Sequence, residues 1–252
     1  MTRRPQNNLS KSGRNSASAP DRWAPFPYGD LRERLSELLD ACAEPPELLE
    51  NGLGYRFRLG EDMPAVEMLL PRLALRDREG APLHPQHILD SDLADAPPLH
   101  LMLLVQAGHS ALGLWEGFSL LRHTVIRKYV VRGNGRAQPL HRKTRGKSRY
   151  GSRLRLREAE EQLEETNART NLWLAESHHP PVVHLSCPVR LFADLIRAEP
   201  LPTFHQRACV LKIPHHVHRP NHEEMLSVHR LLSQGAVRQT LPAPCARAQI
   251  ST

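Results

Sequence analysis

The sequence predicts a mixed α/β (α+β) fold in which helices pack on a sheet, and three observations indicate it. Three short apolar or alternating runs follow one another between residues 99 and 132, as in consecutive antiparallel strands. A long amphipathic segment comes next, at 153–176. Strand-like and helix-like patterns then alternate up to residue 232. Strands followed by such an alternation are typical of a mixed sheet covered by helices.

The N-terminal third predicts one helix, one strand and one segment that fits either a strand or a helix. Residues 29–43 carry apolar side chains at helical spacing, namely Leu31, Leu35, Leu38, Leu39 and Cys42. Residues 55–59 alternate aromatic and basic side chains, as a half-buried strand does. Residues 66–75 fit either a strand or a helix. We therefore expect residues 29–98 to form a helix-and-strand segment that packs on the core.

The centre and the C-terminal half carry clearer patterns. We expect strands at 99–106, 111–117 and 123–132, separated by Gly108-His109 and by 117–121. The helix at 153–176 has one stripe formed by Leu156, Ala159, Leu163, Thr166, Thr170 and Leu174. We expect Gly151 to form the preceding turn and Ser152 to be the N-cap. The remaining predicted elements are a buried strand at 182–187, a helix at 189–198, a strand at 208–213 and a helix at 222–232.

One stretch of the chain carries its positive charge. The sequence has 34 Lys and Arg against 27 Asp and Glu, a formal net charge of +7. Between Glu116 and Glu158 there are thirteen basic residues and no acidic one. Cations at this density attract phosphate backbones, and such binding weakens as the salt concentration rises. The sequence therefore predicts a polyanionic partner.

Composition argues against several other classes of protein. No apolar run approaches the roughly 20 residues of a membrane-spanning helix, and the N-terminal residues lack the apolar centre of a secretory signal. The four cysteines form no CxxC pair, so we expect reduced thiols. These features predict a cytoplasmic protein without membrane contact. The expected organisation is a disordered basic tail at 1–28, the N-terminal segment at 29–98, a catalytic domain at 99–238 and a mobile tail at 239–252.

The histidines are candidate metal ligands. The sequence has 15 of them, including His178-His179, His184 and a Pro-bounded cluster at 215–222. No carboxylate accompanies this cluster at a fixed helical spacing. We therefore expect no metal site and no cofactor, and we expect histidines that lie on the surface or face RNA.

A motif in the basic stretch carries a resemblance. Residues 127–138 read Arg-Lys-Tyr-Val-Val-Arg-Gly-Asn-Gly-Arg-Ala-Gln, and residues 146–155 read Gly-Lys-Ser-Arg-Tyr-Gly-Ser-Arg-Leu-Arg. A strand, a glycine loop that ends in glutamine and a Ser/Gly/Arg-rich helix start thus follow in order. In these features, over about 99–235, the chain resembles the bacterial branch of the VLRF-type release factors. That family is related to the catalytic domain of the eukaryotic and archaeal class-1 peptide chain release factor.

The resemblance implies an RNase H-like fold and a role in ribosome quality control. Members of the family detach nascent chains from tRNA on obstructed large ribosomal subunits. The family's glutamine falls on Gln138 and its loop glycine on Gly135. The termination factors have Gly-Gly-Gln, whereas Ala137 precedes the glutamine here and does not easily take a positive φ. The zinc-finger, ankyrin and segregase-binding parts of the eukaryotic members have no counterpart in this chain.

The chemistry fits these residue types. A peptidyl-tRNA ester is already activated, so the catalyst mainly enters an RNA pocket, places a water and stabilises the oxyanion. A glutamine supplies a carbonyl acceptor and amide donors for this without acting as a nucleophile. The residues expected to bind RNA are Arg132, Arg136, Arg142, Lys143, Arg145, Lys147, Arg149, Arg153 and Arg155. Arg153 and Arg155 face the positive end of a helix dipole, where a phosphate would offset their repulsion.

Two other functions fit the same residues. In a tRNA 3′-end endonuclease, Arg132 and Arg136 would stabilise charge on the phosphate and His141 would act as acid or base. A non-catalytic RNA- or ribosome-binding module would keep the basic face alone. For stacking on bases, Tyr150 is the better candidate, because Trp173 is expected in the core. The expected partners are the large ribosomal subunit, peptidyl-tRNA and rRNA, with the protein as a monomer.

Overall fold

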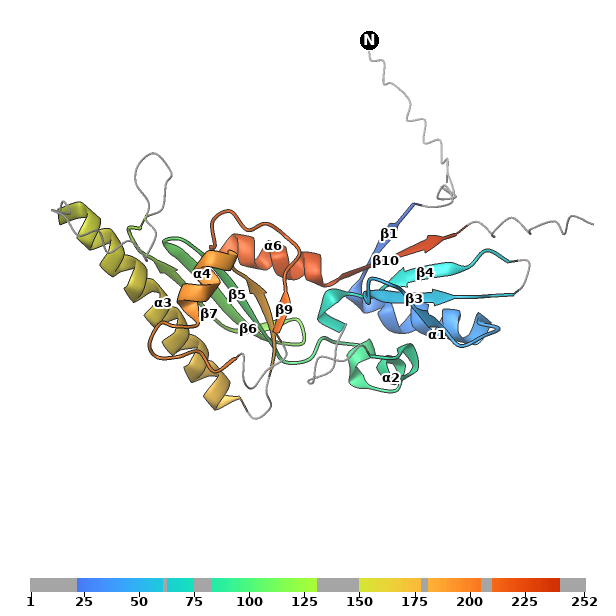
Figure 1. Ribbon diagram of the computed structural model, residues 1–252. Coiled ribbons are helices and arrows are strands. Elements are labelled where there is room, and N and C mark those ends of the chain that lie inside the picture. Colours follow the sequence, from blue (N-terminus) through green and yellow to red (C-terminus); the bar gives the residue numbers. More distant parts are fainter. Residues whose placement is uncertain are drawn as a thin grey trace, which may run out of the picture.

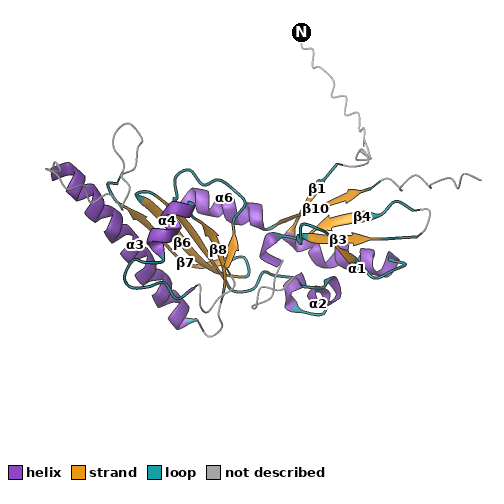
Figure 2. Cartoon of the chain, viewed as in Figure 1, coloured by secondary structure: helices purple, strands orange, loops and turns teal. Residues whose placement is uncertain are grey.

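The structure is a computed structural model of the 252-residue chain. It describes residues 22–60, 63–74, 83–130, 150–177, 181–204 and 210–240. Two five-stranded sheets lie side by side along the long axis of the molecule, each with helices against it (Figures 1 and 2).

The larger sheet has the strand order β7-β6-β5-β8-β9. Its strands β5 (His100–Gln106), β6 (His109–Glu116) and β7 (Ser119–Arg127) are antiparallel neighbours. On the other side of β5, β8 (Val182–Ser186) and β9 (Val210–Lys212) run parallel to it. Three antiparallel strands followed by two parallel ones on the far side of the first make up the RNase H-like sheet. The expected fold class is therefore confirmed.

Helices cover both faces of this sheet (Figure 2). The long helix α3 (Tyr150–Glu176) and α4 (Val189–Leu195) lie on one face, where Leu163 and Trp173 are buried against side chains of β5 and β6. Helix α6 (His222–Leu232) lies on the other face and buries Met225, Val228 and Leu232 against Met102, Leu104, Ala111 and Trp115. The alternation of side chains along β5 thus supplies both cores.

The smaller sheet is built from the two ends of the described chain. Its order is β1 (Ala24–Pro27), β10 (Gln234–Gln239), β4 (Val66–Leu69), β3 (Gly54–Phe57) and β2 (Glu47–Leu48), with all neighbours antiparallel. Helices α1 (Leu31–Ala41) and α2 (Pro85–Leu89) pack on one face, and short 3-10 turns occupy 28–30, 72–74 and 92–94. Strand β10 follows α6 directly, so the end of the chain ties the two sheets together.

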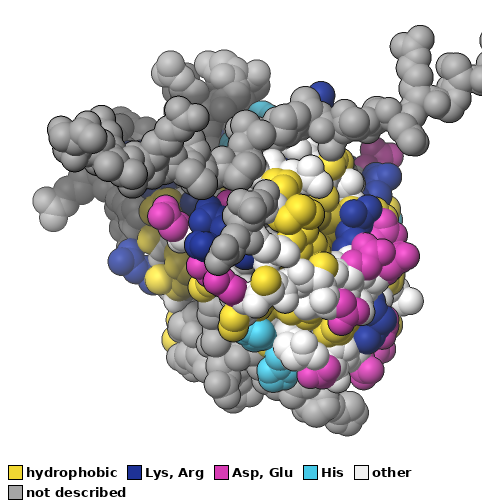
Figure 3. All heavy atoms as spheres, turned by 90° about the vertical axis from the view of Figure 1, so that its right-hand side faces the viewer, with side chains coloured by type: hydrophobic (Ala, Val, Ile, Leu, Met, Phe, Trp, Pro, Cys, Tyr) yellow, Lys and Arg dark blue, Asp and Glu magenta, His cyan; other side chains and the backbone are white. Residues whose placement is uncertain are grey.

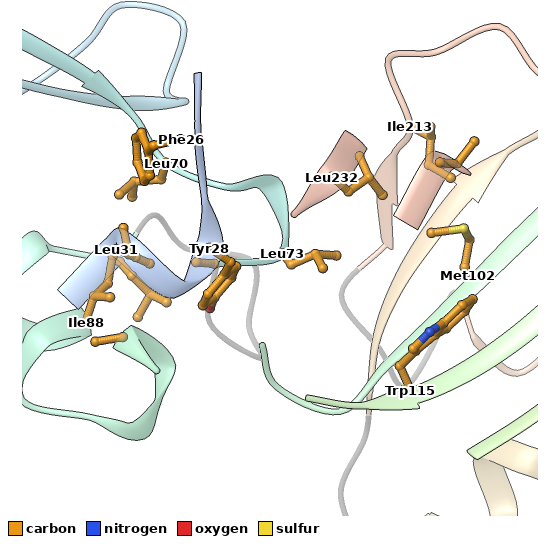
Figure 4. Close-up of a cluster of buried hydrophobic side chains, with 14 of the residues drawn as sticks. Phe26, Tyr28, Leu31, Leu70, Leu73, Ile88, Met102, Trp115, Ile213 and Leu232 are labelled. Carbon is orange, nitrogen blue, oxygen red and sulfur yellow. The ribbon is translucent and has the colours of Figure 1, made fainter. Parts of the chain in front are cut away.

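One apolar cluster runs from the smaller sheet into the larger one. Figure 4 shows it extending from Leu31 and Ile88 past Tyr28 and Leu73 to Trp115. The Tyr28 hydroxyl donates to the Leu93 carbonyl at 2.7 Å. Because the side chains of both sheets belong to the same buried cluster, unfolding of one sheet exposes apolar surface of the other.

The outer face of the smaller sheet carries balanced charge. The carboxylate of Glu67, only 2% exposed, accepts hydrogen bonds from Arg56 and Arg238, and Arg58 pairs with Glu47. In Figure 3, which views this end of the molecule, basic and acidic side chains accordingly lie next to one another. This end therefore does not present a field of one sign.

Several predicted boundaries are corrected. The turns of the larger sheet are only two residues long, at 107–108 and 117–118, so β7 begins at Ser119 and ends at Arg127. Gly108 and Gly117 take φ of 83° and 58°, which allows turns of this length. Helix α3 begins at Tyr150, so the prediction that Ser152 is its N-cap is wrong.

The N-terminal third differs more from the prediction. Of the segment predicted at 66–75, residues 66–69 form the short strand β4 and residues 72–74 a 3-10 turn, and the helix predicted at 29–43 is α1 with a preceding 3-10 turn. Strands β1, β2 and β10 and helix α2 were not predicted. The division of the chain at residue 99 remains a prediction. Of the disordered tail predicted at 1–28, residues 1–21 lie outside the described residues, whereas Ala24–Pro27 form β1. Of the mobile tail predicted at 239–252, residues 241–252 lie outside the described residues.

The described residues hold neither a metal cluster nor a membrane span. No group of three or more His, Cys, Asp or Glu in the described ranges is arranged to hold a metal ion. No helix there is long and apolar enough to cross a membrane. Cys42 and Cys187 are free thiols and half-buried, whereas Cys209 and Cys245 lie outside the described part.

Candidate functional site

The predicted catalytic loop connects β7 to α3. The structure describes its two ends, up to Val130 and from Tyr150. Outside the described residues lie Arg132, Gly135, Arg136, Gln138, His141, Arg142, Lys143, Arg145, Lys147 and Arg149. Arg153, which is exposed, and Arg155, which is half-buried, stand in the first turns of α3. The described part of the site is therefore formed by the segments that hold the two ends of the loop, namely the end of β7 up to Val130 and the helix α3 from Tyr150. We call these segments, with the turn at Gly108 that joins them, the loop base.

The chain leaving β7 is held against the turn between β5 and β6. The Lys128 amide donates to the Gly108 carbonyl at 2.8 Å, and the Val130 amide donates to the Lys128 carbonyl at 3.0 Å. Val130 is 3% exposed. A Cβ at Gly108 would lie 2.8 Å from the Lys128 carbonyl oxygen, and Gly108 has a positive φ, so both space and backbone require glycine there.

A buried amide ties α3 to the same turn. Gln162, 1% exposed, accepts a hydrogen bond from the Gly108 amide at 2.7 Å through Oε1. Its Nε2 donates to the Gln106 carbonyl at 2.8 Å and to Ser110 Oγ at 2.9 Å, and Thr166 also donates to Ser110 Oγ. These buried polar groups satisfy one another, as the low dielectric of the interior demands. The residues that follow β7, the turn between β5 and β6 and the helix α3 are thus held together by hydrogen bonds.

Ion pairs add to this base. Lys128 Nζ lies 3.6 Å from a carboxylate oxygen of Glu161 and 3.8 Å from one of Glu165. Arg157 donates to Glu161 at 2.7 Å, and this guanidinium, helped by Lys128, lowers the pKa of the Glu161 carboxyl. Because these groups are partly exposed, each pair contributes little to stability. Their main effect is to neutralise the middle of α3, so that positive charge is concentrated at its start.

The start of α3 and the exit of β7 present further groups suited to RNA. The Nε of Arg155 is buried without a hydrogen-bond partner among the described residues. Tyr129 is 60% exposed next to the loop, where its ring is available for stacking on a base. The side chain of Tyr150 lies outside the described part, and Trp173 is buried at 5% exposure, which confirms its expected place in the core.

Sequence reasoning missed three members of the base: Lys128, Tyr129 and Gln162. The only hint of Gln162 in the sequence was that the predicted apolar stripe of α3 contains the polar residues Thr166 and Thr170, which are fully buried together with their neighbours Gln162 and Asn167. Lys128 was signalled by Glu161 and Glu165, which stand at i,i+4 spacing on the same helix. Neither signal identifies its partner, because each contact crosses a long separation in sequence.

Replacing Gln162 by methionine tests the base directly. The substitution keeps the shape of the side chain but leaves the Gly108 amide and the Gln106 carbonyl without partners. We expect the free energy of unfolding to fall by about 3 kcal/mol, since each unsatisfied buried group costs about 1–3 kcal/mol. Urea titration followed by circular dichroism measures this. The control is Gln86→Met at an exposed position in α2, and equal stability of the two variants would contradict the assignment.

A buried histidine cluster lies on the α6 face of the sheet, apart from the loop base. His100, His184 and His229 are at most 7% exposed, and the ring of Trp115 stacks on His100 and on His229. His100 Nδ1 lies 2.7 Å from the Pro98 carbonyl and therefore carries a proton, so its Nε2 accepts from His229 Nε2 at 3.1 Å. Burial lowers the pKa of His100 and His229 to about 4 and that of His184 to about 3. The cluster is a neutral part of the core, so the expectation that the histidines lie on the surface or face RNA is wrong for these three.

An RNase H-like sheet whose third strand is joined to a long helix by a cationic stretch of sequence defines the fold class of this part of the chain. The family model described as bVLRF1, the Bacteroidetes VLRF1 release factor, matches residues 100–240, from the start of β5 to the end of β10. This is more than half of the chain. The chain belongs to this family of release factors, which confirms the resemblance and indicates a protein that acts at the ribosome.

Two further comparisons were made. The solved structure of the "Vms1 mitochondrial localization core" is similar at 12% sequence identity and a TM-score of 0.42, over 81% of each chain. None of the curated proteins matches the chain.

Proposed function

We propose that this protein frees the nascent chain from peptidyl-tRNA on the large ribosomal subunit, and that Gln138 in its Gly-x-x-Gln loop carries the reaction. The observation that supports the proposal most is the extent of the family match, which covers both strands of the base, the loop and α3. The loop is anchored at the loop base, where hydrogen bonds join the end of β7 and the helix α3 to the turn between β5 and β6. Such a base fixes the two ends between which the loop is held.

In the proposed reaction, a water attacks the ester carbonyl that joins the peptide to the tRNA. The bond from the carbonyl carbon to the 3′ ribose oxygen then breaks, leaving a peptide with a free carboxylate and a tRNA with an intact 3′ hydroxyl. Gln138 positions the water and donates to the developing oxyanion, while Gly135 lets the loop approach closely. No metal or other cofactor is required for this step.

The basic residues bind the RNA around the ester. Arg132, Arg136, Arg142, Lys143, Arg145, Lys147 and Arg149 hold phosphates of tRNA or rRNA, and Arg153 and Arg155 extend this contact along α3. The protein acts as a monomer in the cytoplasm, where translating ribosomes are found. His141 has no assigned role in ester hydrolysis.

The test is an incubation with purified large subunits that carry labelled peptidyl-tRNA. We expect Gln138→Ala to slow peptide release by about 100-fold or more, the size of effect seen when a preorganised oxyanion donor is removed. Its affinity for the subunits should match that of wild type, because the cations are unchanged. Asn134→Ala, in the same loop, is the matched control and should retain release.

Other outcomes would favour the two alternatives. Release that leaves a shortened tRNA and depends on Arg132 or Arg136 as well as on Gln138, with His141 as acid or base, indicates the tRNA 3′-end endonuclease. Intact binding without release from this substrate indicates a binding module. In that case Arg153→Glu with Arg155→Glu abolishes binding, and Gln138→Ala changes nothing.

A further inference from the structure

A second part of the chain is free of acidic residues. Between Glu199 and Glu223 the sequence contains no Asp or Glu, while it contains Arg207, Lys212, Arg219 and the histidines 205, 215, 216, 218 and 222. Residues 210–222 of this stretch are described by the structure. The segment lies inside the range of the family match, but the proposed function gives it no role, and the described residues show no metal cluster there.

Hydrogen bonding brings this segment to the end of the sheet from which the loop extends. Val217 is 1% exposed, and its carbonyl accepts from Nε2 of Gln106 at 2.7 Å. Gln106 is the last residue of β5, and its own carbonyl accepts from Gln162 of the loop base. In Figure 1 the segment leads into the end of α6 that points away from the smaller sheet. The histidine segment and the loop base therefore share one end of the larger sheet.

The side chains around Val217 point outward. His215, His216, His218 and Arg219 are exposed, whereas Val217 and Pro220 are buried. The amides of His218 and Arg219 donate to the Glu224 carboxylate at 3.1 and 3.2 Å. These bonds fix the backbone and leave the imidazole and guanidinium groups available to solvent. The rings of His216 and His218 pack edge-to-face with centroids 4.4 Å apart.

Strand β7 extends the same surface. The rings of His123 and His222 lie with centroids 4.4 Å apart, which brings β7 against the start of α6. Because side chains alternate along a strand, Arg127 shares the face of His123, and it is exposed at the end of β7 next to Lys128. His222 therefore links the segment that contains Arg219 to the face of β7 that carries His123 and Arg127. The acidic side chains nearby are Glu224, which binds the two amides, and the exposed Glu223.

We propose that this surface, hereafter the histidine ridge (His215, His216, His218, Arg219, His222, His123 and Arg127), binds the phosphate backbone of RNA beside the catalytic loop. The guanidinium groups would pair with phosphate oxygens, and the imidazoles would donate hydrogen bonds to phosphate or ribose. An RNA backbone is a continuous polyanion, so one strand can contact both the ridge and the basic stretch that begins at Arg127. The identity of that RNA as tRNA or rRNA rests on the proposed function.

The position of the ridge favours RNA over an acidic protein surface. Its Arg127 is one of the thirteen cations between Glu116 and Glu158, a stretch of the sequence without any carboxylate. The opposite end of the molecule, by contrast, pairs its arginines with glutamates (Figure 3). Positive charge is thus densest in the stretch of sequence that leads from β7 into α3, although Lys128 and Arg157 pair with carboxylates of α3.

The experiment measures the affinity of the full chain for a fluorescein-labelled RNA hairpin as a function of salt. His218→Ala with Arg219→Ala keeps the backbone hydrogen bonds to Glu224 and removes two exposed side chains. We expect affinity to fall about 3- to 10-fold and the slope of log K against log salt to fall by about 1, as for the loss of one phosphate contact. His87→Ala with Arg190→Ala, which removes the same residue types from exposed sites elsewhere, is expected to bind as wild type.

Two outcomes would contradict the proposal that the histidine ridge binds RNA. One is that both double variants bind the hairpin with the affinity of wild type, and the other is that the protein binds polyglutamate in preference to the hairpin. The result is independent of catalysis, because Gln138→Ala is expected to bind the hairpin normally. If Gln138→Ala releases peptide like wild type while the ridge variant loses RNA affinity, the proposed function is wrong and the proposal that the ridge binds RNA is supported. If Gln138→Ala loses release while the ridge variant binds normally, only the ridge fails.

Discussion

Gly113→Ala is expected to lower the free energy of unfolding by about 3 kcal/mol, near the upper end of the usual range for overpacking a core. A Cβ at this position would lie 2.3 Å from two ring atoms of Trp115 and 2.9 Å from the sulfur of Met225. The Trp115 ring cannot move aside, because it stacks on His229 with centroids 4.7 Å apart and on His100 with centroids 5.6 Å apart.

Urea titration of a double-mutant cycle measures this effect. In a Trp115→Ala background the added methyl group has room, so Gly113→Ala should cost less than about 1 kcal/mol there. Gly29→Ala is the control, since nothing lies within 4 Å of a Cβ at that exposed position. An equal cost of Gly113→Ala in both backgrounds would show that the contact with Trp115 is not its cause.

Acidification from pH 7 to pH 5 is expected to lower the free energy of unfolding by several kcal/mol, on the order of 5. The pKa of His100 and His229 is about 4 and that of His184 about 3 in the folded protein, because burial disfavours the charged rings. In the unfolded chain a histidine pKa is about 6.5. The unfolded state therefore binds protons first, so stability is complete above pH 6.5 and is lost as the pH falls toward 4.

Between pH 7 and pH 5 the change in stability is due to the histidine cluster and not to the carboxyl groups held by ion pairs. The pKa values of Asp95 and Glu161 are lowered by their hydrogen bonds with Arg32 and Arg157, so these carboxyls titrate at lower pH. His184→Phe should reduce the loss between pH 7 and pH 5 by about one third, whereas His87→Ala, at an exposed position, should leave it unchanged. An unfolding free energy that is the same at pH 7 and pH 5 would rule out a buried neutral cluster.

The larger sheet was predictable because its signals are local. Strands β5, β6 and β7 alternate or are wholly apolar, and glycines mark their turns. The smaller sheet was not predictable in the same way. Strand β10 pairs Val237 with Ala24 at the other end of the chain, and strands of two to six residues carry too few side chains to show a period. Such pairings are stabilised by tertiary contacts that no local pattern contains.

The candidate site likewise has one part that the sequence predicts and one part that it does not. The basic stretch and the Gly-x-x-Gln loop around Gln138 are continuous in sequence, and so the charge pattern and the resemblance located them. The base is assembled from Lys128, Gly108 and Gln162, which meet only after folding. A buried glutamine on a helix predicts a partner but does not identify it, since the partner lies 54 residues away.

The most direct test of the central claim is the chemical state of the tRNA 3′ end after release from large subunits by the wild-type protein. Ester hydrolysis directed by Gln138 predicts a full-length tRNA with an intact CCA end and a free 3′ hydroxyl, which can be aminoacylated again without repair. A tRNA shortened at its 3′ end, with the missing nucleotides still attached to the peptide, would contradict the account and show that the protein cuts a phosphodiester bond instead.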